Sequence, residues 1–152
     1  MTKENFWLMK SEPDAYSIEN LEKEKVTIWD GIRNYQARNF MREMEVGDKV
    51  FFYHSNCKPP GIVGLMEVIR KNIIDPTQFD KKSKYYDSKS NKLKPRWDCV
   101  EVRYLSKSAN IISLTELKSR FSSEELLVVK KGNRLSIVPV ENKSAHLLIQ
   151  MM

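Results

Sequence analysis

The middle of the chain, KVFFYHS (Lys49–Ser55), NCKPPG (Asn56–Gly61) and IVGLMEVIRK (Ile62–Lys71), indicates the kind of fold. The first and third segments are rich in β-branched and aromatic residues, which favour strands. The segment between them holds two prolines and a glycine, which are typical of a turn. We therefore predict two strands joined by a turn, with Gly64 bending or bulging the second strand.

Shorter elements precede these strands. We predict a strand over Asn5–Lys10, a short helix with Ser17 as its N-cap, a strand over Val26–Trp29 and a helix from about Asn34 to Met44. The last helix is amphipathic, because its apolar residues follow the i, i+3, i+4, i+7 spacing of one helix face: Ala37, Phe40, Met41 and Met44.

More elements follow the central strands. They are an alternating strand over Arg96–Leu105, a helix opened by the capping box Ser113–Glu116, a hairpin of Glu125–Val129 with Arg134–Val140, and a helix over Asn142–Gln150. Strands dominate the middle, with helices between and after them. The predicted fold is therefore α+β, a small and mostly antiparallel β-barrel or sheet wrapped by helices.

One long segment, DPTQFDKKSKYYDSKSNKLKP (Asp75–Pro95), has no apolar periodicity. Six lysines lie between Lys81 and Lys94. We predict a long mobile loop here, and loops of this length usually carry function or are disordered.

Composition narrows the class of protein. The length of 152 residues fits a single domain, residues 1–152, with a hydrophobic core. The net charge is +6 and the isoelectric point about 9.3. A basic balance favours a polyanionic partner such as nucleic acid, although moderately basic proteins without such a partner are common.

Two cysteines and two histidines argue against a metal site and against a disulfide framework. The first ten residues lack the apolar core of a signal peptide, and no apolar run is long enough to span a bilayer. We expect an intracellular protein, a monomer, with no metal, no cofactor and no membrane partner.

Catalytic motifs are missing from the sequence. There is no glycine-rich phosphate loop, no dinucleotide fingerprint and no G-x-S-x-G elbow. A hydrolytic set can be assembled from Ser11 or Ser55 with His54 and Glu12, but closeness in sequence does not establish geometry. We predict no catalytic residue.

Aromatic and polar residues occur together where the predicted strands begin or end. The groups are Trp7 with Lys10, Ser11 and Glu12; Trp29 with Arg33 and Asn34; Tyr53 with His54 and Ser55; and Trp97 just after the lysine-rich loop. Aromatic faces stack on a nucleobase, which is worth roughly 1–3 kcal/mol per base. Polar side chains recognise the base edge, and lysines and arginines hold phosphates. The set therefore suits a pocket for a planar heterocycle.

The same residues have an ordinary structural interpretation. Each tryptophan, taken singly, is more often a core residue than part of a binding cage. Arg33 and Arg38 can pair with surface acids such as Glu43, and a run of lysines is usually a solvated loop. From composition and spacing alone we infer only a basic α+β domain that is compatible with nucleic-acid binding.

Four long segments together resemble the EVE domain family. They are FWLMKSEPDAYSIENL, WDGIRNYQARNFMREMEVGDKVFFYHSN, GIVGLMEV, and YYDSKS followed by KPRWDCVEVRYL, which span Phe6 to about Leu105. The resemblance implies a PUA-like fold, a closed or nearly closed β-barrel with peripheral helices. It also implies a non-catalytic reader of DNA or RNA that carries methylated or hydroxymethylated cytosine, or methylated adenine. The modified base would be flipped into a pocket beside the barrel.

The resemblance assigns two sets of residues. The base-binding set is Trp7, Ser11, Glu12, Trp29, Asn34, Tyr53, His54, Ser55 and Trp97. The phosphate-binding set is Lys10, Arg33, Arg38, Lys89 and Lys92.

Two other classes of function stay open. A small hydrolase of modified nucleosides, as in some ASCH relatives, needs a general base such as Lys10, Glu12 or His54. A protein-interaction module would bind a peptide in the aromatic pocket. The chain lacks the long basic N-terminal extension of the family's nuclear members, so we expect a cytoplasmic, bacterial protein, or a nuclear one if it is eukaryotic.

Overall fold

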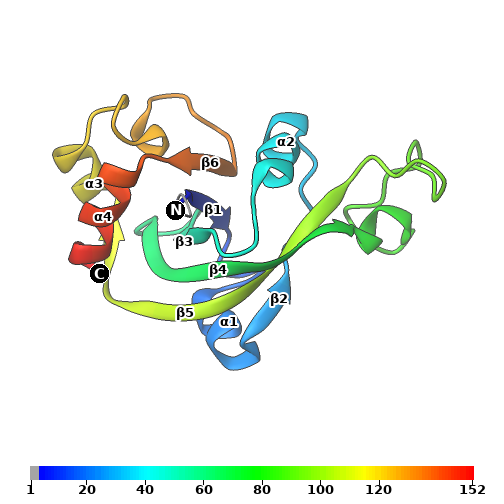
Figure 1. Ribbon diagram of the computed structural model, residues 1–152, viewed down its shortest axis with the longest axis horizontal. Coiled ribbons are helices and arrows are strands. Elements are labelled where there is room, and N and C mark those ends of the chain that lie inside the picture. The colour runs from blue at the N-terminus through cyan, green and yellow to red at the C-terminus, as the bar shows by residue number, and fades with distance from the viewer. Residues whose placement is uncertain (1–3) are drawn as a thin grey trace.

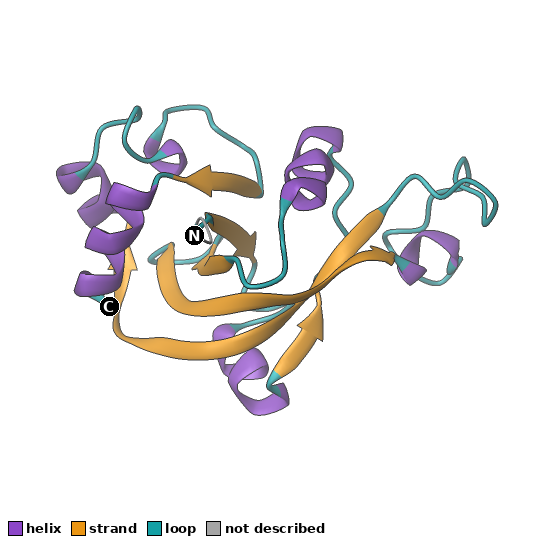
Figure 2. Ribbon diagram, viewed as in Figure 1, coloured by secondary structure: helices purple, strands orange, loops and turns teal. Residues whose placement is uncertain are grey.

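The computed structural model describes residues 4–152, which build a six-stranded sheet flanked by helices (Figure 1; Figure 2). The strands are β1 (Phe6–Ser11), β2 (Val26–Ile28), β3 (Lys49–His54), β4 (Gly61–Ile74), β5 (Asp98–Ser113) and β6 (Ile137–Val140). Their order across the sheet is β2-β5-β4-β3-β1-β6. Among the described residues β1 pairs with β3 in parallel, and the remaining pairings are antiparallel. The predicted α+β class with mostly antiparallel strands is confirmed.

The sheet does not close into a barrel, so that part of the prediction is wrong. β2 and β6 form its two edges, and no hydrogen-bonded pairing joins them in residues 4–152. Both edge strands are short, with three and four residues. The sheet curves instead, because register shifts interrupt the ladder between β4 and β5, including one between Ile62 and Gly64. The bend predicted at Gly64 is therefore confirmed.

Four α-helices and two 3₁₀ turns complete the described chain. They are α1 (Ile18–Glu24), α2 (Tyr35–Glu43), α3 (Leu114–Arg120), α4 (Asn142–Met151), η1 (Pro76–Phe79) and η2 (Leu127–Val129). The first three helices begin at side-chain caps: Ser17 accepts from the Asn20 N–H, Asn34 from the Ala37 N–H and Ser113 from the Glu116 N–H. These caps lie where the sequence predicts helix starts.

The central strands are buried on both faces. In β1, Trp7 and Met9 face a core that also holds side chains of α1 and α2. Phe6 and Leu8 alternate with them and face a second core, built with α3, η2 and α4. The helices therefore cover both faces of the sheet, and they leave the ends of β1 and β3 for the pocket described below.

The predicted hairpin over residues 125–140 is wrong. Leu127–Val129 forms the 3₁₀ turn η2, whose Val128 is buried in the second core. β6 pairs with β1, with Trp7 opposite Pro139. An apolar run this short does not distinguish a strand from a buried turn, because burial in a core produces the same pattern over so few residues. None of the described helices is long and apolar enough to cross a membrane.

Candidate functional site

An open pocket of about 1220 Å³ lies at the ends of β1 and β3. The two strands are parallel neighbours, with Lys10 opposite Tyr53 and Ser11 opposite His54, so both chains leave the sheet at the same edge. The segment after β2, the loop between β4 and β5, and the segment before β6 close the other sides. Five stretches distant in sequence thus meet at one place.

The pocket brings together residues from three of the predicted motifs. Those that line it are Lys10, Ser11, Glu12, Trp29, Arg33, Asn34 and Ser55. Asn34 also caps α2 through its Oδ1, and its amide N–H₂ group has no hydrogen-bond partner within residues 4–152. The amide is therefore free to donate to a ligand.

Other predicted base-binding residues lie outside the pocket lining. Trp7 is 7% exposed, and its indole N–H donates to Asp48 Oδ2 at 2.9 Å. Tyr53 faces the second core, because strand alternation turns it away from Phe52. His54 is buried, and its Nε2 accepts from the Ile18 N–H at 3.1 Å. Burial lowers the pKa of His54, while the charge of Glu19 opposes the shift.

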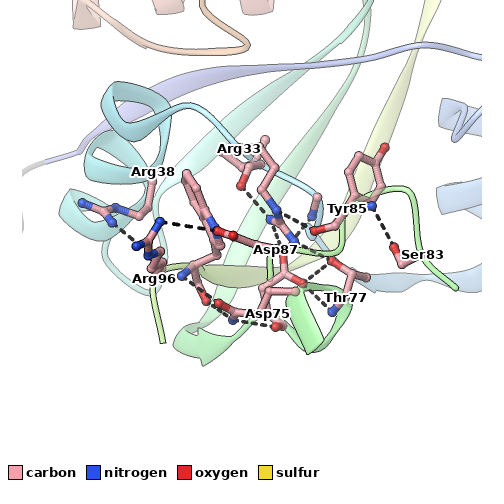
Figure 3. Close-up of polar contacts among 12 residues, drawn as sticks. Arg33, Arg38, Asp75, Thr77, Ser83, Tyr85, Asp87 and Arg96 are labelled. Atoms are coloured by element: carbon pink, nitrogen blue, oxygen red, sulfur yellow. Dashed lines mark hydrogen bonds and ion pairs between the residues drawn. The ribbon is translucent and has the colours of Figure 1, made fainter. Parts of the chain in front are cut away.

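Trp97 belongs to an aromatic and arginine stack beside the pocket. Its ring stacks on Tyr35 with 4.8 Å between centroids, and its indole N–H donates to Asp87 Oδ2 at 2.8 Å. The Arg38 guanidinium lies over both rings. Its Nη1 donates to the Arg96 carbonyl at 2.8 Å (Figure 3). Arg38 and Trp97 thus stabilise the root of the loop, and Lys89 and Lys92 are exposed farther along it.

Asp75 joins the pocket wall to the loop (Figure 3). Its Oδ2 accepts from the Gly31 N–H at 2.8 Å and from Arg33 Nη1 at 3.1 Å, and its Oδ1 accepts from the Thr77 N–H at 2.8 Å. Burial alone would raise the pKa of Asp75, but the hydrogen bonds from Thr77, Gly31 and Arg33 hold that pKa below its usual range. The Asp75 carboxylate is therefore a fixed negative charge behind the pocket wall that Gly31 and Arg33 form.

Buried polar groups also anchor the long segment between β4 and β5. Gln78 is fully buried, and its amide donates to the carbonyls of Asp75 and Trp97, both at 2.7 Å. The Gln78 Oε1 accepts from Ser90 Oγ at 2.6 Å and from the Trp97 N–H at 3.1 Å. The expected loop thus has fixed anchor points, which hydrogen bonds provide in place of an apolar stripe.

Tyr85 carries this loop to the pocket. It lines the pocket, and Arg33 Nε donates to its carbonyl at 2.8 Å. Gly31 lies directly beneath the ring: it has φ +82°, and a Cβ there would lie 2.7 Å from Tyr85 Cε2. Only glycine allows this backbone and this approach together.

Several lining residues were missed by the sequence prediction. They are Tyr16, Glu24, Asp30, Lys84, Tyr85 and Arg134. Asp30 directly follows the predicted strand Val26–Trp29, and Arg134 lies in the predicted hairpin that does not form. Burial and the nearby charge of Asp75 raise the pKa of Asp30, while Arg33 opposes the shift.

The pocket lining holds unpaired cations that suit the anionic part of a ligand. Within residues 4–152, Lys10, Lys84 and Arg134 form no ion pair with a carboxylate. Burial lowers the pKa of Lys10. No group of three or more His, Cys, Asp or Glu side chains in the described chain could hold a metal ion.

Aromatic walls, hydrogen-bonding groups and free cations at one edge of the sheet are the features of a site that suits a flat, anionic ligand. The chain belongs to the EVE domain family, whose model matches residues 5–151. It is 39% identical to human thymocyte nuclear protein 1 over 95% of this chain and 72% of that protein.

Solved structures agree with this family. A protein from Pseudomonas syringae has a TM-score of 0.91 and 42% identity, covering 97% of this chain and 99% of that one. Human THYN1, solved in complex with 5-methylcytosine-containing DNA, has a TM-score of 0.90 and 39% identity, covering 96% of each chain.

Proposed function

We propose that this protein binds DNA carrying 5-methylcytosine and holds the modified base in the pocket at the ends of β1 and β3. The observation that carries the proposal is the convergence of aromatic walls, polar groups and unpaired cations in that one pocket. The choice of ligand is supported by the complex of the related human THYN1 with 5-methylcytosine-containing DNA.

A base reaches such a pocket only after leaving the DNA stack. Tyr16, Trp29 and Tyr85 supply aromatic surface around the pocket. Ser11, Asn34 and Ser55 supply donors and acceptors for the edge of the base. The pocket therefore combines stacking with hydrogen-bond recognition, as single-base recognition requires.

We assign the phosphate contacts to the cations that the protein leaves free. Lys10, Lys84 and Arg134 line the pocket, and Lys89 and Lys92 are exposed on the adjoining loop. The guanidinium of Arg33 instead donates to Tyr85, Asp75 and Thr77. We therefore regard Arg33 as part of the wall, in place of the phosphate contact predicted from sequence.

We infer a non-catalytic role. The Nε2 lone pair of His54 is already occupied by the Ile18 N–H, so His54 is not available as a general base. Lys10 and Glu12 line the pocket, and incubation with 5-methyldeoxycytidine would test them for turnover. Binding to RNA, a monomeric state and an intracellular, cytoplasmic location stay predictions, which oligonucleotide titration, sedimentation and cell fractionation would check.

The proposal is tested by fluorescence anisotropy with matched duplexes that carry cytosine, 5-methylcytosine, 5-hydroxymethylcytosine or methyladenine at one position, and with the corresponding RNA. We expect the tightest binding to 5-methylcytosine DNA. Tyr85→Ala should weaken it by about 1–3 kcal/mol. Tyr86→Ala is the matched control, because its 39%-exposed side chain lies outside the pocket lining.

A different result would contradict the proposal. Equal binding to every base that disappears as salt increases would indicate only a basic surface. A preference for 5-methylcytosine that survives Tyr85→Ala unchanged would place the base elsewhere on the protein.

A further inference from the structure

A pocket for 5-methylcytosine must also reject thymine, because thymine carries the same methyl group on the same ring carbon. The two bases differ at N3, an acceptor in cytosine and a donor in thymine, and at position 4, where cytosine presents an amino donor and thymine a carbonyl acceptor. Recognition of the methyl group cannot separate them. A hydrogen-bond acceptor opposite position 4 separates them, because it pairs with the amino group of cytosine and repels the carbonyl of thymine.

Three carboxylates line the pocket, and two of them are already occupied. Glu12 accepts from Asn56 Nδ2 at 3.3 Å, and Glu24 accepts from the Tyr16 hydroxyl at 2.5 Å. Within residues 4–152, the Asp30 carboxylate has no hydrogen bond to another residue and no ion pair, although Arg33, Lys84 and other cations line the same pocket.

The backbone fixes the position of Asp30. The Trp29 N–H donates to the Val100 carbonyl at 2.8 Å, the Asp30 N–H to the Ile28 carbonyl at 3.0 Å, and the Gly31 N–H to Asp75 Oδ2 at 2.8 Å. Three successive amides are thus bound to the sheet, to the turn and to a buried carboxylate. An acceptor on so rigid a support is preorganised for recognition.

We propose that the Asp30 carboxylate accepts a hydrogen bond from the N4 amino group of the bound base and so selects methylated cytosine over thymine. This inference rests on the function proposed above. With thymine in the pocket, O4 would face a carboxylate oxygen, and two acceptors would be desolvated without a proton between them. A site built around such a hydrogen bond strongly rejects the analogue that lacks the donor.

The test uses three duplexes that differ at one base: 5-methylcytosine opposite guanine, cytosine opposite guanine, and thymine opposite guanine. The mismatched thymine leaves the DNA stack most easily. The cost of flipping the base therefore favours binding of the thymine duplex before any contact in the pocket is counted. We expect the protein to bind the 5-methylcytosine duplex at least about tenfold more tightly than the thymine duplex.

Asp30→Asn should remove this discrimination, because an amide donates to O4 of thymine as well as it accepts from N4 of cytosine. The ratio of its affinities for the 5-methylcytosine and thymine duplexes should fall to about one or lower, because the mismatched thymine leaves the stack more easily. Asp30→Ala, which has no acceptor, should lose affinity for the 5-methylcytosine duplex about tenfold. Asp14→Asn is the matched control, because it makes the same removal of charge at an exposed residue outside the pocket lining and should keep the ratio of the unmodified protein.

Each other outcome has a definite meaning. If Asp30→Asn binds all three duplexes more tightly and keeps the ratio, Asp30 acts only as a repulsive charge and the inference is wrong. If the unmodified protein prefers 5-methylcytosine to cytosine but not to thymine, the inference alone fails. If it does not distinguish 5-methylcytosine from cytosine, the proposed function fails with it. Thermal unfolding of each variant shows whether the protein remains folded.

Discussion

Arg33 and Asp75 form an ion pair with 3.1 Å between Nη1 and Oδ2, in which the Asp75 side chain is 1% exposed and the Arg33 side chain 22% exposed. The pair joins the segment after β2 to the segment after β4 (Figure 3). Because the Gly31 N–H binds the same carboxylate oxygen, the pocket wall and the long loop form one hydrogen-bonded unit.

Asp75→Asn should therefore destabilise the protein strongly. The amide leaves Arg33 without its counter-ion and points an N–H₂ group at donors that now have no acceptor. Breaking a largely buried ion pair of this kind costs about 3 kcal/mol. Urea unfolding would measure the loss. Asp98→Asn is the control, because the 2.8 Å pair of Asp98 with the 42%-exposed Arg42 lies nearer solvent and should cost about 1 kcal/mol or less. Equal losses would contradict the central role of Asp75.

Gly31→Ala tests the contact between the wall and Tyr85. Gly31 and Gly132 have nearly the same backbone, with φ +82° and +80°, but a Cβ meets the Tyr85 ring at Gly31 and nothing within 4 Å at Gly132. Both alanines carry similar backbone strain, about 1–2 kcal/mol. The clash should make Gly31→Ala about 1–3 kcal/mol worse than Gly132→Ala. Adding Tyr85→Ala to Gly31→Ala should recover most of that difference in denaturant unfolding; no recovery would exclude the ring as its cause.

The starts of the helices were predictable because their determinants are local. Ser17, Asn34 and Ser113 each cap a helix whose first turn follows within three residues. The strand cores were predictable for the same reason, since runs such as Lys49–His54 are dense in strand-forming side chains. β4 and β5 run farther than expected because the end of each strand pairs with the start of the other, with Ile74 opposite Asp98 and Ser113 opposite Gly61. Single-strand patterns do not contain that information.

The pocket could be predicted only in part, because its geometry depends on distant partners. The motifs around Ser11 and Ser55 were recognised, but their meeting depends on the parallel pairing of β1 with β3. The role of Arg33 follows from Asp75 and Thr77, which lie 42 and 44 residues away in sequence. Trp97 looked like a base-stacking residue, and only its stack on Tyr35 places it beside the pocket.

His54 should make stability depend on pH. Its Nε2 accepts from the N–H of Ile18, the first residue of α1, so this nitrogen must be unprotonated. Burial lowers the pKa of folded His54 below 6.5, so the unfolded chain takes up the proton first. Stability is therefore retained above about pH 6.5 and lost as pH falls, by at most about 1.4 kcal/mol per pH unit. Urea unfolding at pH 7.5 and 5.5 should show a larger loss in the unmodified protein than in His54→Gln, whose amide oxygen can still accept. Parallel losses would contradict this role, because every other titrating group is common to both proteins.

The free cations of the pocket should set the salt dependence of DNA binding. Arg134 and Lys84 line the pocket and form no ion pair within residues 4–152, whereas the Arg38 guanidinium is occupied by Asn39 and the Arg96 carbonyl. Each lost phosphate contact lowers the slope of log K against log salt by about 1. Arg134→Ala and Lys84→Ala should each show this decrease, with weaker binding to every duplex but an unchanged preference for 5-methylcytosine. Lys118→Ala, on the exposed side of α3, should leave the slope unchanged. If Arg38→Ala lowers the salt slope by about 1 and Arg134→Ala does not change it, the DNA phosphates lie along the stack of Tyr35 and Trp97 and not along the pocket.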